Sequence, residues 1–199
     1  MFLELAAVEP NGSSLFVTGN LHTVNTTLFG LLLKSDDGGK TWTEPAKRIR
    51  SAALEQIQFP DFQHGFISGV KIEPLPRDPF LLSTSDGGMT WKQAALFEEP
   101  RPGSIQQFWF DSATSGQLIL DASEGGSKRY ERFETADSGG SWASREVTAR
   151  ETQLPQARPR EYASWRIRSD PKAYRVERKT AANTWETVAS FAIQTGECR

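Results

Sequence analysis

Residues 35–42 read SDDGGKTW, a run of small, polar, turn-forming residues that ends on a tryptophan. The same pattern returns as TSDGGMTW at 84–91 and as TADSGGSW at 135–142. A degenerate copy, RKTAANTW, lies at 178–185. A polar loop that recurs in phase and always ends on the same large side chain indicates an internal structural repeat.

The repeated box has the form Ser/Thr, any residue, Asp, any residue, Gly, any residue, Ser/Thr, Trp. In the fourth copy only the last two positions fit well, because Thr180 and Ala182 replace Asp and Gly. The residues that match the pattern are Ser35, Asp37, Gly39, Thr41, Trp42, Thr84, Asp86, Gly88, Thr90, Trp91, Thr135, Asp137, Gly139, Ser141, Trp142, Thr184 and Trp185.

The tryptophans of successive boxes are 49, 51 and 43 residues apart. Periods of about 40–50 residues are typical of blade repeats, and the segments between the boxes read as short strands separated by turns. We therefore predict an all-β, β-propeller-like array of about four blades, each of three to four antiparallel strands, with a degenerate last blade. The prediction is one domain over 1–199, with blades at about 1–51, 52–101, 102–150 and 151–199.

Within a full unit the box joins the third strand to the fourth. Glycine permits the positive φ of a tight turn, and the Asp carboxylate accepts backbone N–H groups inside that turn. The Trp that follows is expected to insert between neighbouring sheets, because a large indole gains most from burial. The box is thus predicted to anchor a polar hairpin to an apolar core.

These stretches resemble the Asp-box, or BNR, repeat of sialidases, sortilin-type ectodomains and photosystem II assembly factor-like propellers. The second unit, with IQFPDFQHGFISG at 57–69, is most similar to the assembly-factor and uncharacterised bacterial type. The resemblance implies that the boxes are structural and lie on the face away from the usual ligand site. It also implies an extracytoplasmic location.

In a row of four blades, the outer faces of the two end blades have no neighbouring blade, so their apolar side chains must be covered in another way. Three arrangements cover them: a closed ring within one chain, a larger ring completed by a homodimer, or a curved open array with capped ends. Of these we expect ring closure within the chain.

The resemblance sets out what a sialidase would need: three converging arginines, a Tyr–Glu nucleophile pair and an acidic proton donor. The early Arg-Ile-Pro motif is absent from the first unit, and the adjacent pairs Tyr130–Glu131 and Glu161–Tyr162 place neighbours on opposite strand faces. No catalytic residues, cofactor or metal site are predicted, since the two histidines, His22 and His64, are far apart. A shortened sialidase-like glycoside hydrolase and a lectin-like glycan binder remain the alternatives.

The expected function is a non-catalytic binding or assembly scaffold, because loops on a rigid scaffold form natural binding surfaces. The loops at 70–80 and 121–132 connect second and third strands, at the sheet ends opposite the boxes. The rim that they form carries the predicted binding residues, which are Lys71, Arg77, Arg101, Lys128, Arg129 and Arg132.

The charge of the chain is uneven, although the formal net charge is only −2. Residues 145–179 hold ten Lys/Arg against five Asp/Glu, whereas residues 1–144 hold twelve against eighteen. This favours an acidic protein partner or self-association, and the mixture of signs argues against a nucleic-acid surface. No apolar run is long enough to span a membrane, and the N-terminal MFLELAAVEP lacks the basic segment of a signal peptide, so we expect a soluble chain.

Overall fold

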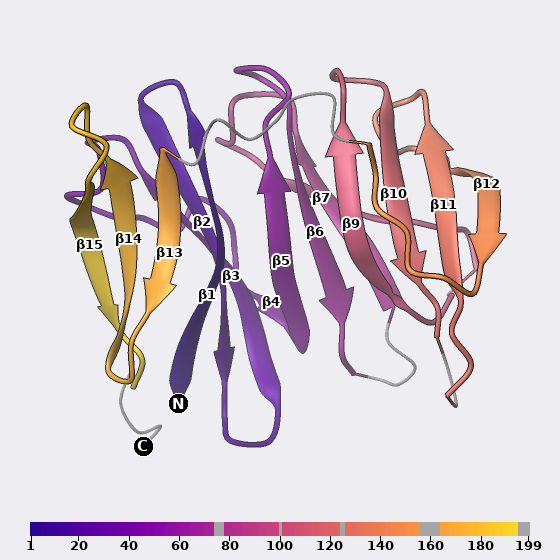
Figure 1. Ribbon diagram of the computed structural model, residues 1–199, viewed down its shortest axis with the longest axis horizontal. Coiled ribbons are helices and arrows are strands. Elements are labelled where there is room, and N and C mark those ends of the chain that lie inside the picture. Colours follow the sequence, from indigo (N-terminus) through magenta and orange to yellow (C-terminus); the bar gives the residue numbers. More distant parts are fainter. Residues whose placement is uncertain (74–77, 100, 124–125, 156–163, 195–199) are drawn as a thin grey trace. The chain divides into compact units, whose positions relative to one another are not determined.

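The computed structural model describes residues 1–73, 78–99, 101–123, 126–155 and 164–194. These residues form four antiparallel sheets of three to four strands, which confirms the predicted all-β fold (Figure 1). The rim residue Arg77 lies outside the described residues. Two compact units divide the chain: unit 1 comprises Met1–Ile57 with Arg158–Arg199, and unit 2 comprises Gln58–Ala157.

The strands follow one another along the chain within each sheet. The first sheet contains β1 (Phe2–Asn11), β2 (Ser14–His22), β3 (Thr27–Ser35) and β4 (Ile49–Arg50). The second contains β5 (Ala52–Gln58), β6 (Gly65–Lys71), β7 (Asp78–Thr84) and β8 (Lys92–Ala95). The third contains β9 (Ser104–Phe110), β10 (Gly116–Asp121), β11 (Tyr130–Thr135) and β12 (Ala143–Thr148). The last contains β13 (Trp165–Ser169), β14 (Ala173–Lys179) and β15 (Trp185–Ala192).

In unit 1 the last sheet packs on the first. Alternation along β2 points Leu15, Val17 and Leu21 to one face, where they share an apolar core with Val176 of β14. The backbone also joins the two sheets, because the Leu3 N–H donates to the Ile193 carbonyl at 2.7 Å. The sequence predicted a reduced last blade, and packing of that blade on the first is one of the contacts that the expected ring closure requires.

In unit 2 the second and third sheets enclose a core of aromatic and aliphatic side chains. Phe66 of β6 stacks on Phe110 of β9, with ring centroids 3.5 Å apart and planes nearly parallel at 1°. Gln58 donates to the Phe110 carbonyl and accepts from the Phe110 N–H, both at 2.8 Å. These reciprocal bonds satisfy a buried amide, which is the usual condition for burying one.

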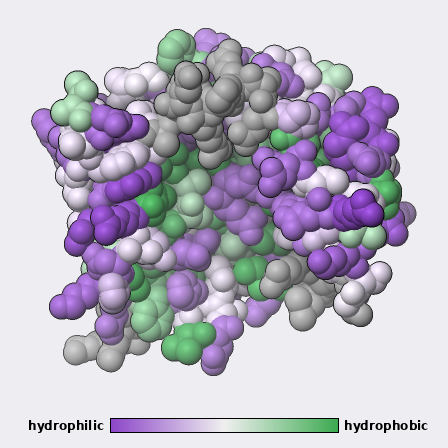
Figure 2. All heavy atoms as spheres, viewed as in Figure 1, coloured by the Kyte–Doolittle hydropathy of each residue, from purple (hydrophilic) through white to green (hydrophobic). Residues whose placement is uncertain are grey.

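The other face of the third sheet is covered by the segment that follows β12. Leu154 is buried there against Ile119 and Tyr130, with Trp109 at the edge of the same cluster. The Leu154 N–H donates to Gln107 Oε1 at 2.8 Å, which fixes this strap to β9. Beyond the strap this face is polar: hydrophilic side chains gather over β10–β12 in the view of Figure 2.

Candidate functional site

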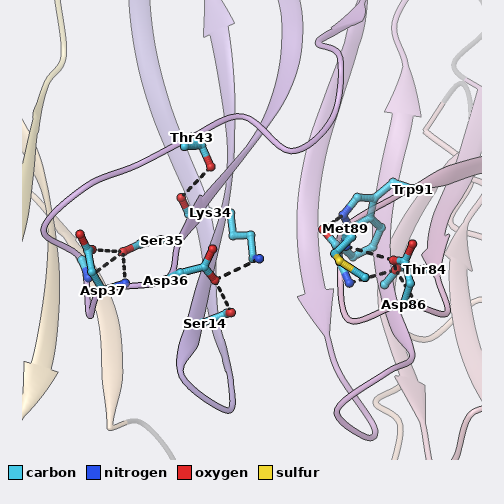
Figure 3. A network of polar contacts seen from close by, with 12 residues as sticks. Ser14, Lys34, Ser35, Asp36, Asp37, Thr43, Thr84, Asp86, Met89 and Trp91 are labelled. Carbon is cyan, nitrogen blue, oxygen red and sulfur yellow. Dashed lines mark hydrogen bonds and ion pairs between the residues drawn. The ribbon is translucent and has the colours of Figure 1, made fainter.

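The first Asp box is built around the Asp37 carboxylate (Figure 3). Its Oδ1 accepts from Ser35 Oγ at 2.8 Å and from the Lys40 and Thr41 N–H groups at 3.0 and 2.9 Å. Its Oδ2 accepts from Thr41 Oγ1 at 2.7 Å. Because these donors occupy both oxygens, the carboxylate closes the turn and offers little to an external ligand.

The second and third boxes repeat this geometry, with Asp86 and Asp137 in the same role. Hydrogen bonds from Thr90 and Thr84 lower the pKa of Asp86 from 3.8 to about 2, and bonds from Ser141 and Thr135 lower the pKa of Asp137 to about 2. In the degenerate fourth copy the hydroxyls of Thr180 and Thr184 bond each other at 2.8 Å, without a carboxylate.

Each complete box ends in a half-buried tryptophan. Trp42 packs in the unit 1 core, with its ring 5.5 Å from Phe191 of β15, and Trp142 packs in the unit 2 core, 6.1 Å from Phe110. The box tryptophans of the first and third sheets therefore pack in cores that lie between sheets. The boxes act as structural anchors, so the candidate site lies elsewhere.

The predicted rim lies at the strand ends opposite the boxes. The second box follows β7 and the third follows β11, whereas Lys71 ends β6 and Lys128 precedes β11. Both lysines are exposed. Arg101, in the connection from β8 to β9, and Arg129, just before β11, approach each other through a shared carboxylate.

That carboxylate belongs to Glu131, which is only 3% exposed. Arg101 Nη1 donates to its Oε2 at 2.9 Å, and Arg129 Nε donates to its Oε1 at 2.6 Å. The two arginine side chains are 46% and 57% exposed, so each keeps part of its guanidinium in water. The result is a buried carboxylate that holds two solvent-facing guanidinium groups at fixed positions, which we call the arginine clamp.

Aromatic and backbone contacts hold the clamp in place. The Arg101 guanidinium carbon lies 4.9 Å from the ring centroid of Phe97 and 5.7 Å from that of Phe133, both within cation–π range. On the other side the Arg129 N–H donates to Ser123 Oγ at 3.0 Å, which braces the loop before β11. Both guanidinium groups are thus oriented before any ligand arrives.

Comparison between repeats shows that Glu131 is unusual. It stands four residues before the first position of its box, and the same place holds Leu31, Phe80 and Tyr174 in the other units. Leu31 and Phe80 are buried, as Glu131 is. A buried carboxylate is far more costly than an apolar side chain unless it is paired, so its presence points to a role other than packing.

The sequence did not identify Glu131 as a rim residue, although the signal was present. An acidic residue at a repeat position that is otherwise apolar is visible once the boxes are aligned. Arg132, in contrast, was placed on the rim by sequence proximity. It lies within β11 and its side chain pairs with Glu134 at 3.2 Å and Glu146 at 3.6 Å, away from the clamp.

The described residues also bear on catalytic and metal sites. Tyr130 packs beneath the Leu154 strap while Glu131 meets Arg101, so these neighbours point to opposite faces of β11. Across the part of the chain that the structure describes, no group of three or more His, Cys, Asp or Glu residues is placed to hold a metal ion. The same part contains no helix long and apolar enough to cross a membrane.

The fold and the boxes define the chain as an all-β protein of the propeller-like class. No protein-family model matches it. A search of curated proteins likewise finds no match.

Among solved structures, the chain is similar to YCF48 bound to D1 peptide, with 21% identity and a TM-score of 0.51 over 72% of this chain. It covers 39% of that YCF48 chain, about two fifths of its length. It is also similar to Zg3597, a family 117 glycoside hydrolase from the marine bacterium Zobellia galactanivorans, with 9% identity and a TM-score of 0.49 over 97% of this chain and 71% of that one. A third similar structure is the α-L-arabinofuranosidase Arb93A from Fusarium graminearum, in complex with an iminosugar inhibitor, with 15% identity and a TM-score of 0.45 over 94% of this chain and 60% of that one. At these identities the likeness concerns the fold alone.

Proposed function

We propose that this chain is a non-catalytic binding scaffold whose rim, opposite the Asp boxes, captures a carboxylate-bearing segment of a protein partner. The observation that carries the proposal is the arginine clamp of Arg101, Glu131 and Arg129. A guanidinium group has five N–H donors, and the bonds to Glu131 use one donor of each arginine. The donors that remain suit the planar, bidentate recognition of a carboxylate.

The exposed lysines at the same strand ends favour the same partner chemistry. Lys71 and Lys128 add positive charge at the rim, which would speed the approach of an acidic segment. The similarity to a structure of YCF48 with a bound peptide supports a peptide as the class of ligand. Since this chain covers only part of that protein, the support extends to the class of ligand and not to the identity of the peptide.

The test begins with selection of peptides from a random display library on the immobilised protein. Peptides rich in Asp and Glu, or dependent on a free C-terminal carboxylate, are the expected product. A selected peptide then reports binding by fluorescence anisotropy. Arg129→Gln should weaken its affinity by about tenfold, because one charge-assisted fork is lost.

Glu131→Leu separates binding from folding. This variant installs the residue that the first unit carries at the same repeat position, Leu31. We expect it to remain folded, since an apolar side chain suits that position, and to lose peptide binding because the two arginines lose their common anchor. Arg48→Gln, in an exposed ion pair of unit 1, is the matched control and should bind normally. Undiminished binding by Glu131→Leu and Arg129→Gln would reject the rim as the site. Turnover of a fluorogenic sialoside or arabinofuranoside would reject the non-catalytic assignment.

A further inference from the structure

The last sheet has two faces of opposite character. Its register places Ile167 and Val176 opposite each other on the face that packs on the first sheet. The next positions along the strands, which point the other way, carry cationic side chains. This outward face, which we call the cationic face, includes Arg166 and Arg168 of β13, Arg175, Glu177 and Lys179 of β14, and Trp185 of β15.

Trp185 occupies the box position at which the first and third units place a tryptophan in a core between sheets. Trp42 meets Phe191 of the neighbouring sheet, and Trp142 meets core residues of unit 2. Trp185 is instead covered by the Arg166 guanidinium, whose carbon lies 4.1 Å from the ring centroid. Buried Glu177 holds that guanidinium through a 2.7 Å bond to Nε. The Arg166 guanidinium therefore covers this indole, whereas in the first unit an apolar side chain of the neighbouring sheet covers the box tryptophan.

Two further arginines stand directly across from each other on the same face. Arg168 pairs with Arg175 in the β13–β14 register. Like charges at such cross-strand positions destabilise a sheet, so folding alone gives no reason for the pair. Asp170 contacts Arg175 at 2.7 Å and also lies within electrostatic range of Arg168, which is exposed, so one carboxylate faces two guanidinium groups. The face keeps an excess of positive charge.

We propose that the cationic face of the β13–β15 sheet is a second docking surface and that its occupant is an acidic polypeptide segment. Carboxylates of such a segment would pair with Arg168 and Arg175 and relieve their mutual repulsion. The charge of residues 145–179, ten Lys/Arg against five Asp/Glu, extends the complementarity beyond the face itself. The proposal is independent of the arginine clamp, which lies in unit 2.

A polypeptide fits this face better than a nucleic acid does. Binding of single strands relies on exposed aromatic platforms on which bases stack. The one indole on the face, Trp185, is already covered by Arg166, so it offers no free platform. What remains exposed are guanidinium and ammonium groups suited to carboxylates.

The test uses a fluorescein-labelled 12-residue peptide of alternating Glu and Ser, with the full-length protein, at low and at physiological salt. The double variant Arg168→Gln, Arg175→Gln should weaken peptide binding by roughly tenfold, and each single variant by less. Neither side chain is buried, so these variants should fold. Arg48→Gln and Lys92→Gln, at exposed sites outside this face, serve as charge-matched controls and should bind normally. Because an acidic peptide also suits the clamp, the double variant is compared in an Arg129→Gln background as well, where the loss that it causes should be equally large if the two surfaces are separate.

Several outcomes would overturn the assignment. Equal binding by the double variant and the controls would show that the face is not the site. A 12-residue oligothymidylate that binds as tightly as the peptide, and loses affinity in the same variant, would identify a general polyanion surface. A salt-sensitive increase in solution mass that the double variant abolishes would assign the face to a second copy of the chain.

Discussion

Ser138 is a residue at which the third box departs from the first two. Its φ is 63°, a region that strains a residue with a Cβ, and the equivalent positions hold Gly38 and Gly87. We predict that Ser138→Gly raises the free energy of unfolding by about 0.5–1 kcal/mol, since relief of strain exceeds the added flexibility of the unfolded chain. Chemical denaturation measures the change.

The same substitution elsewhere in the box provides a matched control. Ser141→Gly removes the hydroxyl that donates to Asp137 Oδ2 at 2.7 Å, so it should lower stability. If both variants shift stability in the same direction, backbone strain at Ser138 is not what distinguishes the third box.

The box carboxylates make stability depend on acidic pH. In the folded chain hydrogen bonds lower the pKa of Asp86 and Asp137 from 3.8 to about 2, and they lower the pKa of Asp37 as well. Because the pKa of these carboxyl groups is lower in the folded chain than in the unfolded chain, ionised carboxylates stabilise the fold. Their contribution to the free energy of unfolding is complete above a pH of about 5 and is lost as the pH falls from about 4 through about 2. We predict that the urea midpoint falls over this window.

Asp137→Asn tests the origin of that loss. The variant should be less stable than the parent chain at neutral pH. Its free energy of unfolding should also fall by a smaller amount on acidification, because one of the three carboxylates no longer titrates. Glu99→Gln, at an exposed position outside the boxes, should retain the full acid sensitivity. An unchanged pH profile in Asp137→Asn would assign the acid sensitivity to other groups.

At the scale of elements, the boxes made the strands predictable because they fix where each hairpin turns. The last sheet, predicted as a degenerate blade, has three strands. The first sheet departs from the predicted pattern of a strand directly after the box: only Ile49–Arg50 pairs as β4, with one isolated bridge from Lys34 to Thr43. Pro45 lies between these contacts and lacks the N–H that a ladder needs.

The site was predictable only in part. Loop position brought attention to Arg101 and Arg129, and the structure shows that both contact Glu131. Glu131 itself was considered only as a partner of Tyr130. That it occupies a repeat position with an apolar residue in the other units becomes visible only when the repeats are aligned. Arg132 was assigned to the rim although one step along a strand reverses the face. Packing of the last sheet on the first was expected only through the hypothesis of ring closure, because its contacts are distant in sequence and no local pattern encodes them.

The box tryptophans are predicted to contribute unequally. Trp42→Ala should destabilise the protein by about 2–4 kcal/mol, because it empties part of the unit 1 core next to Phe191. Trp185→Ala should destabilise it by about 1 kcal/mol, because its cation–π contact is with the partly exposed guanidinium of Arg166. Thermal and denaturant unfolding compare the two. Equal losses would mean that Trp185 is as well packed as the complete boxes.

At the scale of the whole molecule, the question is whether one chain covers its own apolar sheet faces or needs a second chain to cover them. The faces that pack within each unit are apolar: Leu15 and Val17 meet Val176 in unit 1, and Phe66 meets Phe110 in unit 2. The second face of the β13–β15 sheet carries Arg166, Arg168 and Arg175 instead. The second face of the β9–β12 sheet is covered by the strap at Leu154.

Neither of these faces therefore offers the apolar area on which a blade of another chain would pack. We predict that the protein is a monomer of 22.2 kDa in solution, rather than half of a ring shared between two chains. Sedimentation equilibrium over a wide concentration range at physiological salt measures this. A stable dimer that persists at high salt would contradict the prediction, because only an apolar interface would resist charge screening. A Leu154→Asp variant provides the converse control: by dislodging the strap it should expose Ile119 and Tyr130 and promote association that the parent chain lacks.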